Sequence, residues 1–362
     1  MFQDISIERL NELRSKNDVT VIDVRSPSEY RDSTIPGSIN IPFFTDEERA
    51  EIGTLYKQVN MQTAKERGLE IMSAKLPAFV KRFAEIPGNK VVFCWRGGMR
   101  SRTTATVLSL MGIHVYRLDG GYRAFRKWTV ETLENMEFTP QVYVLHGNTG
   151  TGKTEILKRL KEKGYPVIDL EGLAGHRGSI FGEIGLKSNN QKTFDSLLLE
   201  EILRYREEPY ILIEAESKRI GKVILPEFLI RKKEQGSHIM LEAPKALRVT
   251  NILKDYQPEE HAEQSLHAFH QIKSRIHTPV AQEIEESLQT QQFGRAVELL
   301  LVYYYDPRYA HTSINYGDEF AKTHPIQFET LDEAVERVEM RIKELVPEVS
   351  IGSESKAQTS IG

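Results

Sequence analysis

Residues 147–154 carry the feature that most restricts how this chain can fold. They match the pattern G-x-x-x-x-G-K-[ST], in which backbone N–H groups surround a diphosphate and the lysine adds a positive charge. The pattern functions between a strand and a helix, so it commits this part of the chain to an α/β arrangement. The phosphate-binding residues that it predicts are Gly147, Asn148, Thr149, Gly150, Thr151, Gly152, Lys153 and Thr154.

The segments on either side of this loop have the sequence patterns of a strand and of a helix. Residues 142–145 form a short apolar run typical of a strand, and residues 155–163 have helical patterning that ends at Gly164. This context favours a phosphate-binding loop over a glycine turn with a surface lysine. The hydroxyl of Thr154 would ligate Mg²⁺ wherever a metal accompanies the phosphates.

A loop of this kind hydrolyses nucleotides only with the help of a carboxylate from a neighbouring strand. The candidates are Asp169, at the end of the apolar run 167–169, and Glu214, at the end of the run 210–214. Neither run is four apolar residues closed by aspartate, although the second comes close. We therefore expect phosphate binding without predicting ATP hydrolysis. A diphosphate-bearing substrate would use the same loop.

The first third of the chain alternates strand and helix signals. Residues 19–24, 90–93 and 114–118 are short apolar or β-branched runs that predict buried strands. A helix is expected over residues 100–111, with Gly112 as its stop. Strands that alternate with helices predict a mainly parallel sheet covered by helices.

The alternation of strand and helix signals stops and begins again near residues 134–140, where we place a domain boundary. We therefore expect an α/β protein with a parallel-sheet domain over residues 1–134. A second α/β domain with a helical C-terminal part is expected over residues 139–345, ending in a helix over residues 331–345. Residues 346–362 are rich in serine, glycine and glutamate and predict a disordered tail.

The composition excludes several classes of protein. Cys94 is the one cysteine, which excludes an internal disulfide framework and a cysteine-based zinc cluster and fits a reducing cytosol. We expect a cytoplasmic protein with no membrane partner, because no apolar run approaches ~18 residues and the start lacks a signal peptide. A net charge of −4 excludes a generally basic nucleic-acid binder but allows a local basic patch.

Cys94 lies where a predicted strand passes through a loop into a helix. Backbone N–H groups near a helix start, the bend at Gly97 and Gly98, and the charges of Arg96 and Arg100 would together bind an anion. The same positive field favours a nucleophilic thiolate. A buried structural cysteine is the alternative, and the flanking glycines and arginines favour the nucleophile.

Two polar loops after strand ends are weaker candidates. The first could support the phosphate site and the second could contact RNA phosphates, whereas solvated loops or a solvated helix face are the alternatives. The residues concerned are His176 and Arg177 in the first loop, and Lys218, Arg219 and Lys222 in the basic stretch that runs to residue 233.

Two other patterns suggest ordinary structure rather than a site. Of the histidines at 261, 267, 270 and 277, only the middle two have helical i,i+3 spacing, so we expect solvated helix positions and no metal site. Residues 303–305 are three tyrosines, for which we expect an aromatic core strand, with stacking on bases as the alternative.

Three segments of the first domain look like signatures of the rhodanese domain. They are residues 23–30 (DVRSPSEY), 35–42 (IPGSINIP) and 118–122 (LDGGY), and the resemblance covers about residues 10–130. Common single-domain rhodaneses place an arginine five residues after the cysteine, whereas Arg100 is six residues after Cys94. This C-x5-R spacing resembles cysteine phosphatases that share the rhodanese fold. The spacing favours a phosphate-like substrate over thiosulfate.

A rhodanese domain joined to a P-loop domain resembles the bacterial tRNA 2-selenouridine synthase family. Residues 170–178 and 214–221 look like motifs of that family, and the resemblance covers about residues 5–345. It implies that selenium replaces sulfur in the wobble 2-thiouridine of tRNA, with selenophosphate as donor and geranyl diphosphate as alkylating substrate. It implies as partners such a tRNA and an enzyme that supplies selenophosphate. By position, Cys94 would carry selenium as an S-selanylcysteine intermediate.

Two other interpretations stay open from the residues. One is a rhodanese-fold cysteine phosphatase or sulfurtransferase coupled to a P-loop nucleotide-binding domain, although the loop holds no aspartate to serve as general acid. The other is a nucleotide- or RNA-binding sensor with a silent rhodanese domain, against which an intact Cys94 argues. The sequence also leaves open whether the P-loop binds a nucleotide or geranyl diphosphate, and whether Mg²⁺ takes part.

Overall fold

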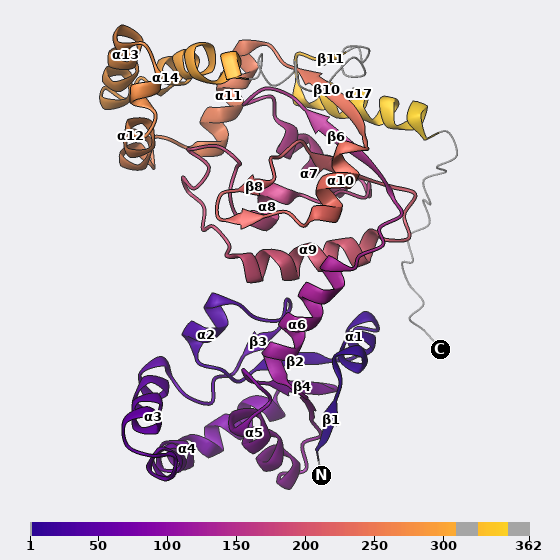
Figure 1. Ribbon diagram of the computed structural model, residues 1–362, viewed down its shortest axis with the longest axis vertical. Helices are drawn as coiled ribbons and strands as arrows, with labels where there is room; N and C mark the ends of the chain where they lie inside the picture. Colours follow the sequence, from indigo (N-terminus) through magenta and orange to yellow (C-terminus); the bar gives the residue numbers. More distant parts are fainter. Residues whose placement is uncertain (1, 309–324, 347–362) are drawn as a thin grey trace.

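The computed structural model describes residues 2–308 and 325–346 of the 362 residues. Two parallel sheets, one formed early and one late in the chain, are each flanked by helices (Figure 1). This confirms the expected α/β class. Within the described ranges, no helix is long and apolar enough to cross a membrane.

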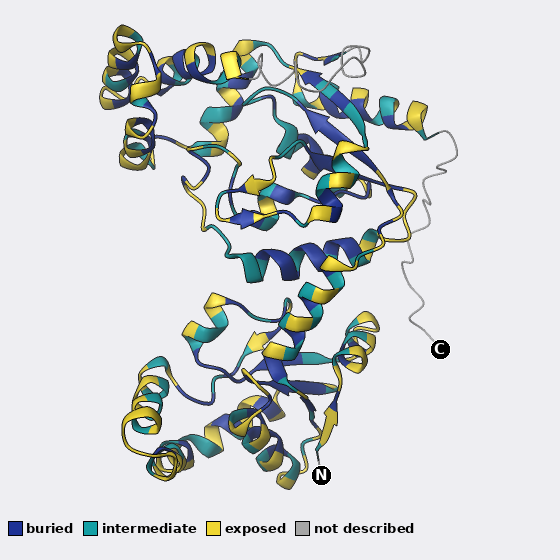
Figure 2. Cartoon of the chain, viewed as in Figure 1, coloured by how far each residue is buried: buried dark blue, intermediate teal, exposed yellow. Residues whose placement is uncertain are grey.

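The first sheet has five strands in the order β1-β5-β4-β2-β3, and every pairing in it is parallel. Its central strands are short apolar or β-branched runs, which suits strands that are covered on both faces. Figure 2 shows these strands buried beneath the surrounding helices. The strands are β1 Gln3–Ile5, β2 Thr20–Asp23, β3 Ile39–Asn40, β4 Lys90–Phe93 and β5 Tyr116–Leu118.

Six helices surround this sheet. Helices α3 and α4 form a pair in a region for which the sequence patterns predicted no element (Figure 1), and α4 packs on the central strands β2 and β4. Helix α3 begins with a capping box at Thr45 and Glu48. The helices are α1 Ile7–Ser15, α2 Pro27–Asp32, α3 Asp46–Gln58, α4 Met61–Ala84, α5 Met99–Leu110 and α6 Gly121–Glu134.

The second sheet has four strands in the order β11-β10-β6-β7, again with parallel pairing. The strand that precedes the phosphate-binding loop, β6, lies between β10 and β7 and is therefore central. A small antiparallel pair, β8 and β9, follows β7. The strands are β6 Gln141–His146, β7 Tyr210–Glu214, β8 Arg219–Ile220, β9 Val223–Ile224, β10 Ser237–Glu242 and β11 Ile326–Gln327.

The helices of the second half fall into two groups. Helices α7, α9 and α17 contact the sheet region, whereas α12, α13 and α14 pack on one another around their own apolar core to one side (Figure 1). The helices are α7 Lys153–Glu162, α8 Leu170–Ala174, α9 Gln191–Tyr205, α10 Glu227–Glu234, α11 Lys245–Tyr256, α12 Ala262–His270, η1 Lys273–Arg275, α13 Thr278–Gln289, α14 Phe293–Leu300, η2 Leu301–Tyr305 and α17 Leu331–Leu345.

Helix α6 joins the two halves and packs along α9 (Figure 1). A partly buried ion pair crosses this contact, with 2.7 Å between Arg126 Nη2 and Asp195 Oδ2. An exposed ion pair also joins Lys192 of α9 to Asp32 of α2, at 2.9 Å. Charge pairs therefore bind the two halves at more than one point.

Two sequence-based expectations differ from the structure, and a third falls outside the residues that it describes. Residues 167–169 do not form a strand: only Val167 makes a single bridge, to Leu212, because Asp169 already caps helix α8. The tyrosines at 303–305 do not form a core strand, since they lie in the π-helical segment η2, where Tyr303 is exposed and Tyr304 is buried. The tail expected over residues 346–362 lies, beyond Val346, outside the described residues.

Candidate functional site

The thiol of Cys94 lies at the bottom of a loop between β4 and α5. The residue is only 3% exposed, and its Sγ is 3.2 Å from the hydroxyl oxygen of Ser101. Helix α5 begins at Met99, so the N–H groups of its first turn have no carbonyl partner within the helix. These groups and the serine hydroxyl are donors that suit a negative charge at this end of the helix.

Gly120 and Gly121, which precede and begin helix α6, hold the Cys94 loop in place. A Cβ atom on Gly121 would lie 2.2 Å from the Cys94 carbonyl oxygen and 2.4 Å from the Gly97 nitrogen, so only glycine fits there. The N–H of Tyr122 donates to the Cys94 carbonyl at 2.8 Å. The motif at residues 118–122 therefore supports the loop that carries the thiol.

The two arginines expected to bind an anion differ in their surroundings. The side chain of Arg100 is mostly buried and is bound by Glu29, with 3.1 Å between Nη2 and Oε1 and a second, shorter contact. Arg96 is exposed. Gly97 adopts a left-handed conformation, with φ of +63°, and bends the chain between them as expected. A Cβ on Gly98 would meet no atom within 4 Å, so the loop is open on that side.

The phosphate-binding loop has the conformation that its glycines predict. Gly150 and Gly152 both have positive φ, +81° and +89°, which side-chain-bearing residues rarely adopt. The ammonium group of Lys153 donates to the carbonyl of Gly147 at 2.8 Å, so it lies over the loop. The hydroxyl of Thr151 donates to the carbonyl of Asn148 at 2.6 Å and closes the turn.

Helix α11 supports the same loop through residues that the sequence patterns did not single out. The guanidinium Nε of Arg248 donates to the carbonyl of Thr149, and the Asn251 amide donates to that of Gly150, both at 2.9 Å. Arg248 is buried and ion-paired with Asp306 at 2.6 Å. In a helix rich in charged residues, the sequence does not indicate which arginine will be buried. These contacts could therefore not be predicted.

A group of carboxyl side chains lies beside the last residue of the loop. The Thr154 hydroxyl donates to Glu171 at 2.8 Å, and the N–H of Glu171 donates to Glu214 at 2.7 Å. Burial, with the nearby charge of Glu216, raises the pKa of Glu171 to about 8. Glu214 is fully buried, and this burial raises its pKa well above the ordinary value.

The two carboxylates predicted from strand ends, Glu214 and Asp169, both make hydrogen bonds that support the backbone. Glu214 Oε2 has no hydrogen-bond partner, while Oε1 joins β7 to the start of α8. Asp169 accepts from the N–H of Gly172 at 2.7 Å as the N-cap of α8. Glu171, which follows Asp169 by two residues, is the carboxyl that contacts the loop, and its position in the short helix α8 could be recognised only from the fold.

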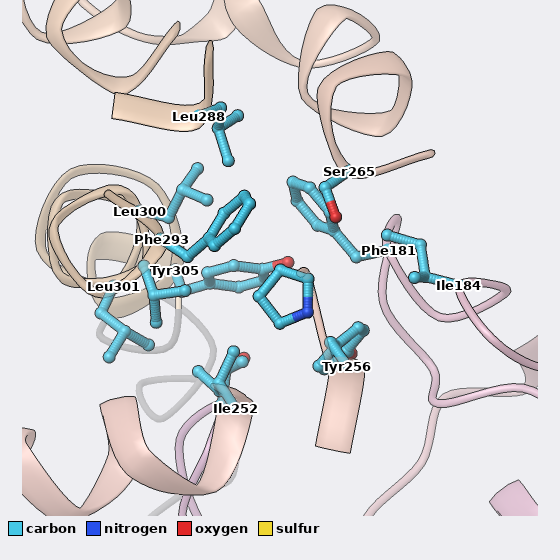
Figure 3. A pocket seen from close by; sticks show the side chains of 13 residues that line it. Phe181, Ile184, Ile252, Tyr256, Ser265, Leu288, Phe293, Leu300, Leu301 and Tyr305 are labelled. Atoms are coloured by element: carbon cyan, nitrogen blue, oxygen red, sulfur yellow. The ribbon is translucent and has the colours of Figure 1, made fainter. Parts of the chain in front are cut away.

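An apolar pocket opens beside the phosphate-binding loop. The empty space within its lining is about 540 Å³, including the part that is open to solvent. Figure 3 shows Phe181 and Ile184 on one side facing Phe293 and Leu300 on the other. Its lining residues are Thr149, Phe181, Ile184, Ile252, Tyr256, Pro258, Ser265, Leu288, Phe293, Val297, Leu300, Leu301 and Tyr305.

Comparison with known proteins agrees with this two-part arrangement. A family model described as the tRNA 2-selenouridine synthase AAA domain matches residues 140–325, and a rhodanese-like domain model matches residues 6–127. A tRNA 2-selenouridine synthase from Shewanella pealeana is 32% identical over 329 residues, covering 82% of this chain and 89% of that protein. The chain belongs to the tRNA 2-selenouridine synthase family.

Other relatives share this description. The tRNA 2-selenouridine synthase from Nitrosomonas europaea is 34% identical over 262 residues, covering 70% of this chain and 67% of that protein. Among solved structures, a rhodanese-related protein from Thermoplasma volcanium is 23% identical, with a TM-score of 0.23. That match covers 35% of this chain and 93% of the other.

The weaker candidates occupy two different environments. Arg177 donates to the carbonyls of Ile184 and Asp255, at 2.7 and 2.6 Å, so it positions the segment that lines the apolar pocket. His176 is buried and its Nδ1 accepts from the N–H of Gly178 at 3.1 Å. Burial lowers the pKa of this histidine, which therefore stays neutral. Both residues support the fold around the site.

Lys218, Arg219 and Lys222 of the predicted basic stretch are exposed, but their charges are partly paired. Lys218 forms an ion pair with Glu227, and Lys222 forms one with Glu183 at 3.0 Å. Arg219 donates to the carbonyl of Gly221 at 3.1 Å. Among the residues that the structure describes, no group of three or more His, Cys, Asp or Glu side chains could hold a metal ion.

Proposed function

We propose that this protein is a tRNA 2-selenouridine synthase that acts in two steps: S-geranylation of wobble 2-thiouridine by geranyl diphosphate, then selenation with selenophosphate. Membership of the family and the names of its relatives support the overall reaction. The order of steps has a chemical reason. Sulfur bound to C2 would leave as a highly basic sulfide, whereas an alkylated sulfur leaves as a thiolate.

The observation that carries the first step is that Thr149 belongs both to the phosphate-binding loop and to the lining of the apolar pocket. A ligand at this place needs a diphosphate at one end and a hydrocarbon at the other, because polar groups in the pocket lining are few. Geranyl diphosphate has this form. As its C–O bond breaks, the loop amides and Lys153 stabilise the departing diphosphate.

A nucleotide is the competing ligand for the P-loop. Its ribose and base carry polar groups, which would lose hydrogen bonds with water in a pocket lined by phenylalanine, leucine and isoleucine. Of the two candidates for a hydrolytic carboxylate, Glu214 is fully buried and hydrogen-bonded to backbone, and Asp169 caps helix α8. These two observations favour a prenyl diphosphate.

Filling the pocket separates the two ligands. In Val297→Phe the added ring should take the space of the hydrocarbon, so affinity for geranyl diphosphate should fall at least about tenfold while inorganic diphosphate binds as before. Isothermal titration calorimetry measures both. The matched control is Met340→Phe, at an exposed position of α17. Equal loss of both ligands, or unchanged geranyl diphosphate binding, would contradict the assignment.

Selenium must pass from selenophosphate to the base with no net change in its oxidation state. Selenium in selenophosphate is already at the oxidation level of selenide, so an S–Se⁻ group on Cys94 would form only if an oxidant removed two electrons. Attack of the thiolate on phosphorus needs none: the S–P bond forms, the P–Se bond breaks, and selenide leaves with the electron pair. The released HSe⁻ then adds to C2 of the alkylated base, geranyl thiolate leaves, and loss of the selenium proton gives 2-selenouridine.

The loop around Cys94 supports this phosphoryl route. The longer C-x5-R spacing and the free N–H groups at the start of α5 suit a tetrahedral anion. Selenium leaves as HSe⁻, keeping the proton that it carries in hydrogen selenophosphate. Because HSe⁻ is a weak base, its departure requires no further general acid, and the loop holds no aspartate. Water then hydrolyses the phosphocysteine, and the Ser101 hydroxyl, 3.2 Å from Sγ, can donate to the departing thiolate.

Mass spectrometry of the Cys94 peptide after incubation with selenophosphate tests this step. The expected product is a phosphoryl adduct that resists dithiothreitol and accumulates in Ser101→Ala, where thiolate departure is slower. A dithiothreitol-sensitive adduct with the isotope pattern of selenium would instead support the S-selanylcysteine intermediate and require an oxidant.

A further inference from the structure

The residue directly after the thiol, Trp95, presents an indole to solvent. It is 38% exposed, and one side of the ring is supported by Tyr122, whose ring centroid is 5.7 Å away. The guanidinium carbon of Arg25 lies 5.9 Å from the indole centroid. Arg25 is itself buried and bound by Asp23 at 2.6 Å, so the indole rests on a rigid base.

Two exposed arginines flank this indole. Arg96 follows it in the chain, and the N–H of Arg123, at the start of α6, donates to the Trp95 carbonyl at 2.9 Å. Over residues 2–308 and 325–346, neither Arg96 nor Arg123 takes part in an ion pair. This differs from the basic stretch, where Glu227 and Glu183 neutralise two of the lysines.

We propose that Trp95, Arg96 and Arg123, here called the Trp95 platform, form an RNA-binding surface that holds the target nucleotide at the thiol. The indole stacks on the base, and the two guanidinium groups contact the adjoining phosphates. The inference rests on the proposed function, which makes a tRNA anticodon loop the substrate.

The chemistry of the platform matches single-stranded RNA. Proteins recognise unpaired bases in RNA loops by stacking them on aromatic rings and by placing arginine or lysine beside the backbone. A base in the wobble position belongs to such a loop. A guanidinium can also stack or bind phosphate in two contacts, which a lysine cannot.

The position of the platform explains why it would serve the selenium step. Neighbouring Cα atoms are about 3.8 Å apart, so a base stacked on Trp95 lies beside the loop that carries the thiol. Cys94 itself is almost completely buried, and Gly98 leaves space on one side of the loop because a Cβ there would meet nothing within 4 Å. A flat base can therefore approach along the open side while the indole supports one of its faces.

Fluorescence gives a test of binding that does not depend on turnover. The chain has two tryptophans, so Trp128→Phe leaves Trp95 as the single tryptophan, which can be excited selectively over the tyrosines. An anticodon stem-loop with S-geranyl-2-thiouridine at the wobble position should quench this emission, whereas the same stem-loop with an abasic wobble site should not. Equal quenching by both would overturn the stacking contact.

Kinetics then tests the role of the ring. Trp95→Ala should lower kcat/KM for selenation of an S-geranylated stem-loop by about ten- to a hundredfold, as expected for loss of one base–aromatic stack, and Trp95→Phe should retain most of the rate. The aromatic control is Tyr56→Ala, an exposed ring on α3. Unchanged selenation in Trp95→Ala would refute the proposal.

The arginines are tested by salt dependence. Arg96→Ala and Arg123→Ala should each flatten the slope of log affinity against log salt by about 0.7, the value for one phosphate contact in a single strand. Lys127→Ala, an exposed cation on the same helix as Arg123, is the control and should leave the slope unchanged. Unchanged slopes in both arginine variants would place RNA elsewhere.

Geranylation separates failure of this inference from failure of the proposed function. At saturating tRNA the Trp95 variants should still convert 2-thiouridine to its S-geranyl form, because the platform holds the nucleotide at the thiol whereas alkylation takes place at the P-loop. If wild-type protein makes neither product, the proposed function fails. If it makes both and Trp95→Ala does as well, only the platform fails.

Discussion

Thr154, the last residue of the phosphate-binding loop, donates a hydrogen bond to the Glu171 carboxyl, with 2.8 Å between the two oxygens. Because burial raises the pKa of Glu171 to about 8, this carboxyl is mainly protonated at neutral pH. A protonated Glu171 would not repel a diphosphate placed at Thr154. The contact joins the loop to helix α8 and makes the site compatible with a highly negative ligand.

The raised pKa of Glu171 predicts how stability changes with pH. The unfolded carboxyl titrates near 4.5 and the folded one near 8, so between these values the folded state binds more protons and stability falls as pH rises. In Glu171→Gln the fall should be shallower and the variant should be the more stable protein at pH 8.5. Thermal unfolding at pH 5.5 and 8.5 measures the difference in stability, because each kcal/mol changes the midpoint temperature by about 2–4 °C. Parallel curves for the two proteins would contradict the assignment.

Lys153→Ala should separate the two steps. Removing one charge that stabilises the departing diphosphate commonly costs ~3 kcal/mol, so geranylation should fall about a hundredfold. Supplying S-geranylated tRNA with selenophosphate should restore 2-selenouridine without nucleotide, as measured by nucleoside mass spectrometry. Equal failure on both substrates would mean that the loop serves a shared step such as tRNA docking.

Cys94→Ser should block only the second step. The serine hydroxyl is a far weaker acid than a thiol and does not supply the nucleophile, so S-geranyl-2-thiouridine should accumulate and 2-selenouridine should be absent. Liquid chromatography with mass spectrometry of tRNA nucleosides from cells that carry the variant detects both products. Formation of 2-selenouridine by this variant would exclude the cysteine from selenium transfer.

The basic stretch gives a separate prediction about tRNA. Replacing Lys218, Arg219 and Lys222 together by alanine should weaken tRNA binding and flatten its salt slope by up to ~0.9 for each duplex phosphate that the variant no longer neutralises. The effect should be smaller than that of three unpaired cations, because Lys218 and Lys222 must first leave their glutamate partners. Filter binding at several salt concentrations measures it. An unchanged slope would shift tRNA binding toward the Trp95 platform.

The local elements of this fold follow from short stretches of sequence. Strand β4 has the predicted bounds of residues 90–93, helix α17 those of residues 331–345, and Gly112 and Gly164 follow their helices with positive φ. Each of these depends on side chains within a few residues, such as a β-branched run or a glycine that adopts a left-handed conformation. The strand predicted at residues 167–169 is wrong because an apolar run alone does not distinguish a strand from the approach to a helix cap.

The sequence alone predicts two anion-binding loops, because the glycine spacing at residues 147–154 and the C-x5-R spacing from Cys94 to Arg100 are local features of backbone and charge. Only the tertiary structure decided what surrounds them. Arg248 reaches Thr149 from 99 positions along the chain, and Phe181 meets Phe293 across a pocket to which separate helices contribute. Such contacts depend on how helices and strands pack, because no local sequence pattern indicates which distant side chain will be the partner.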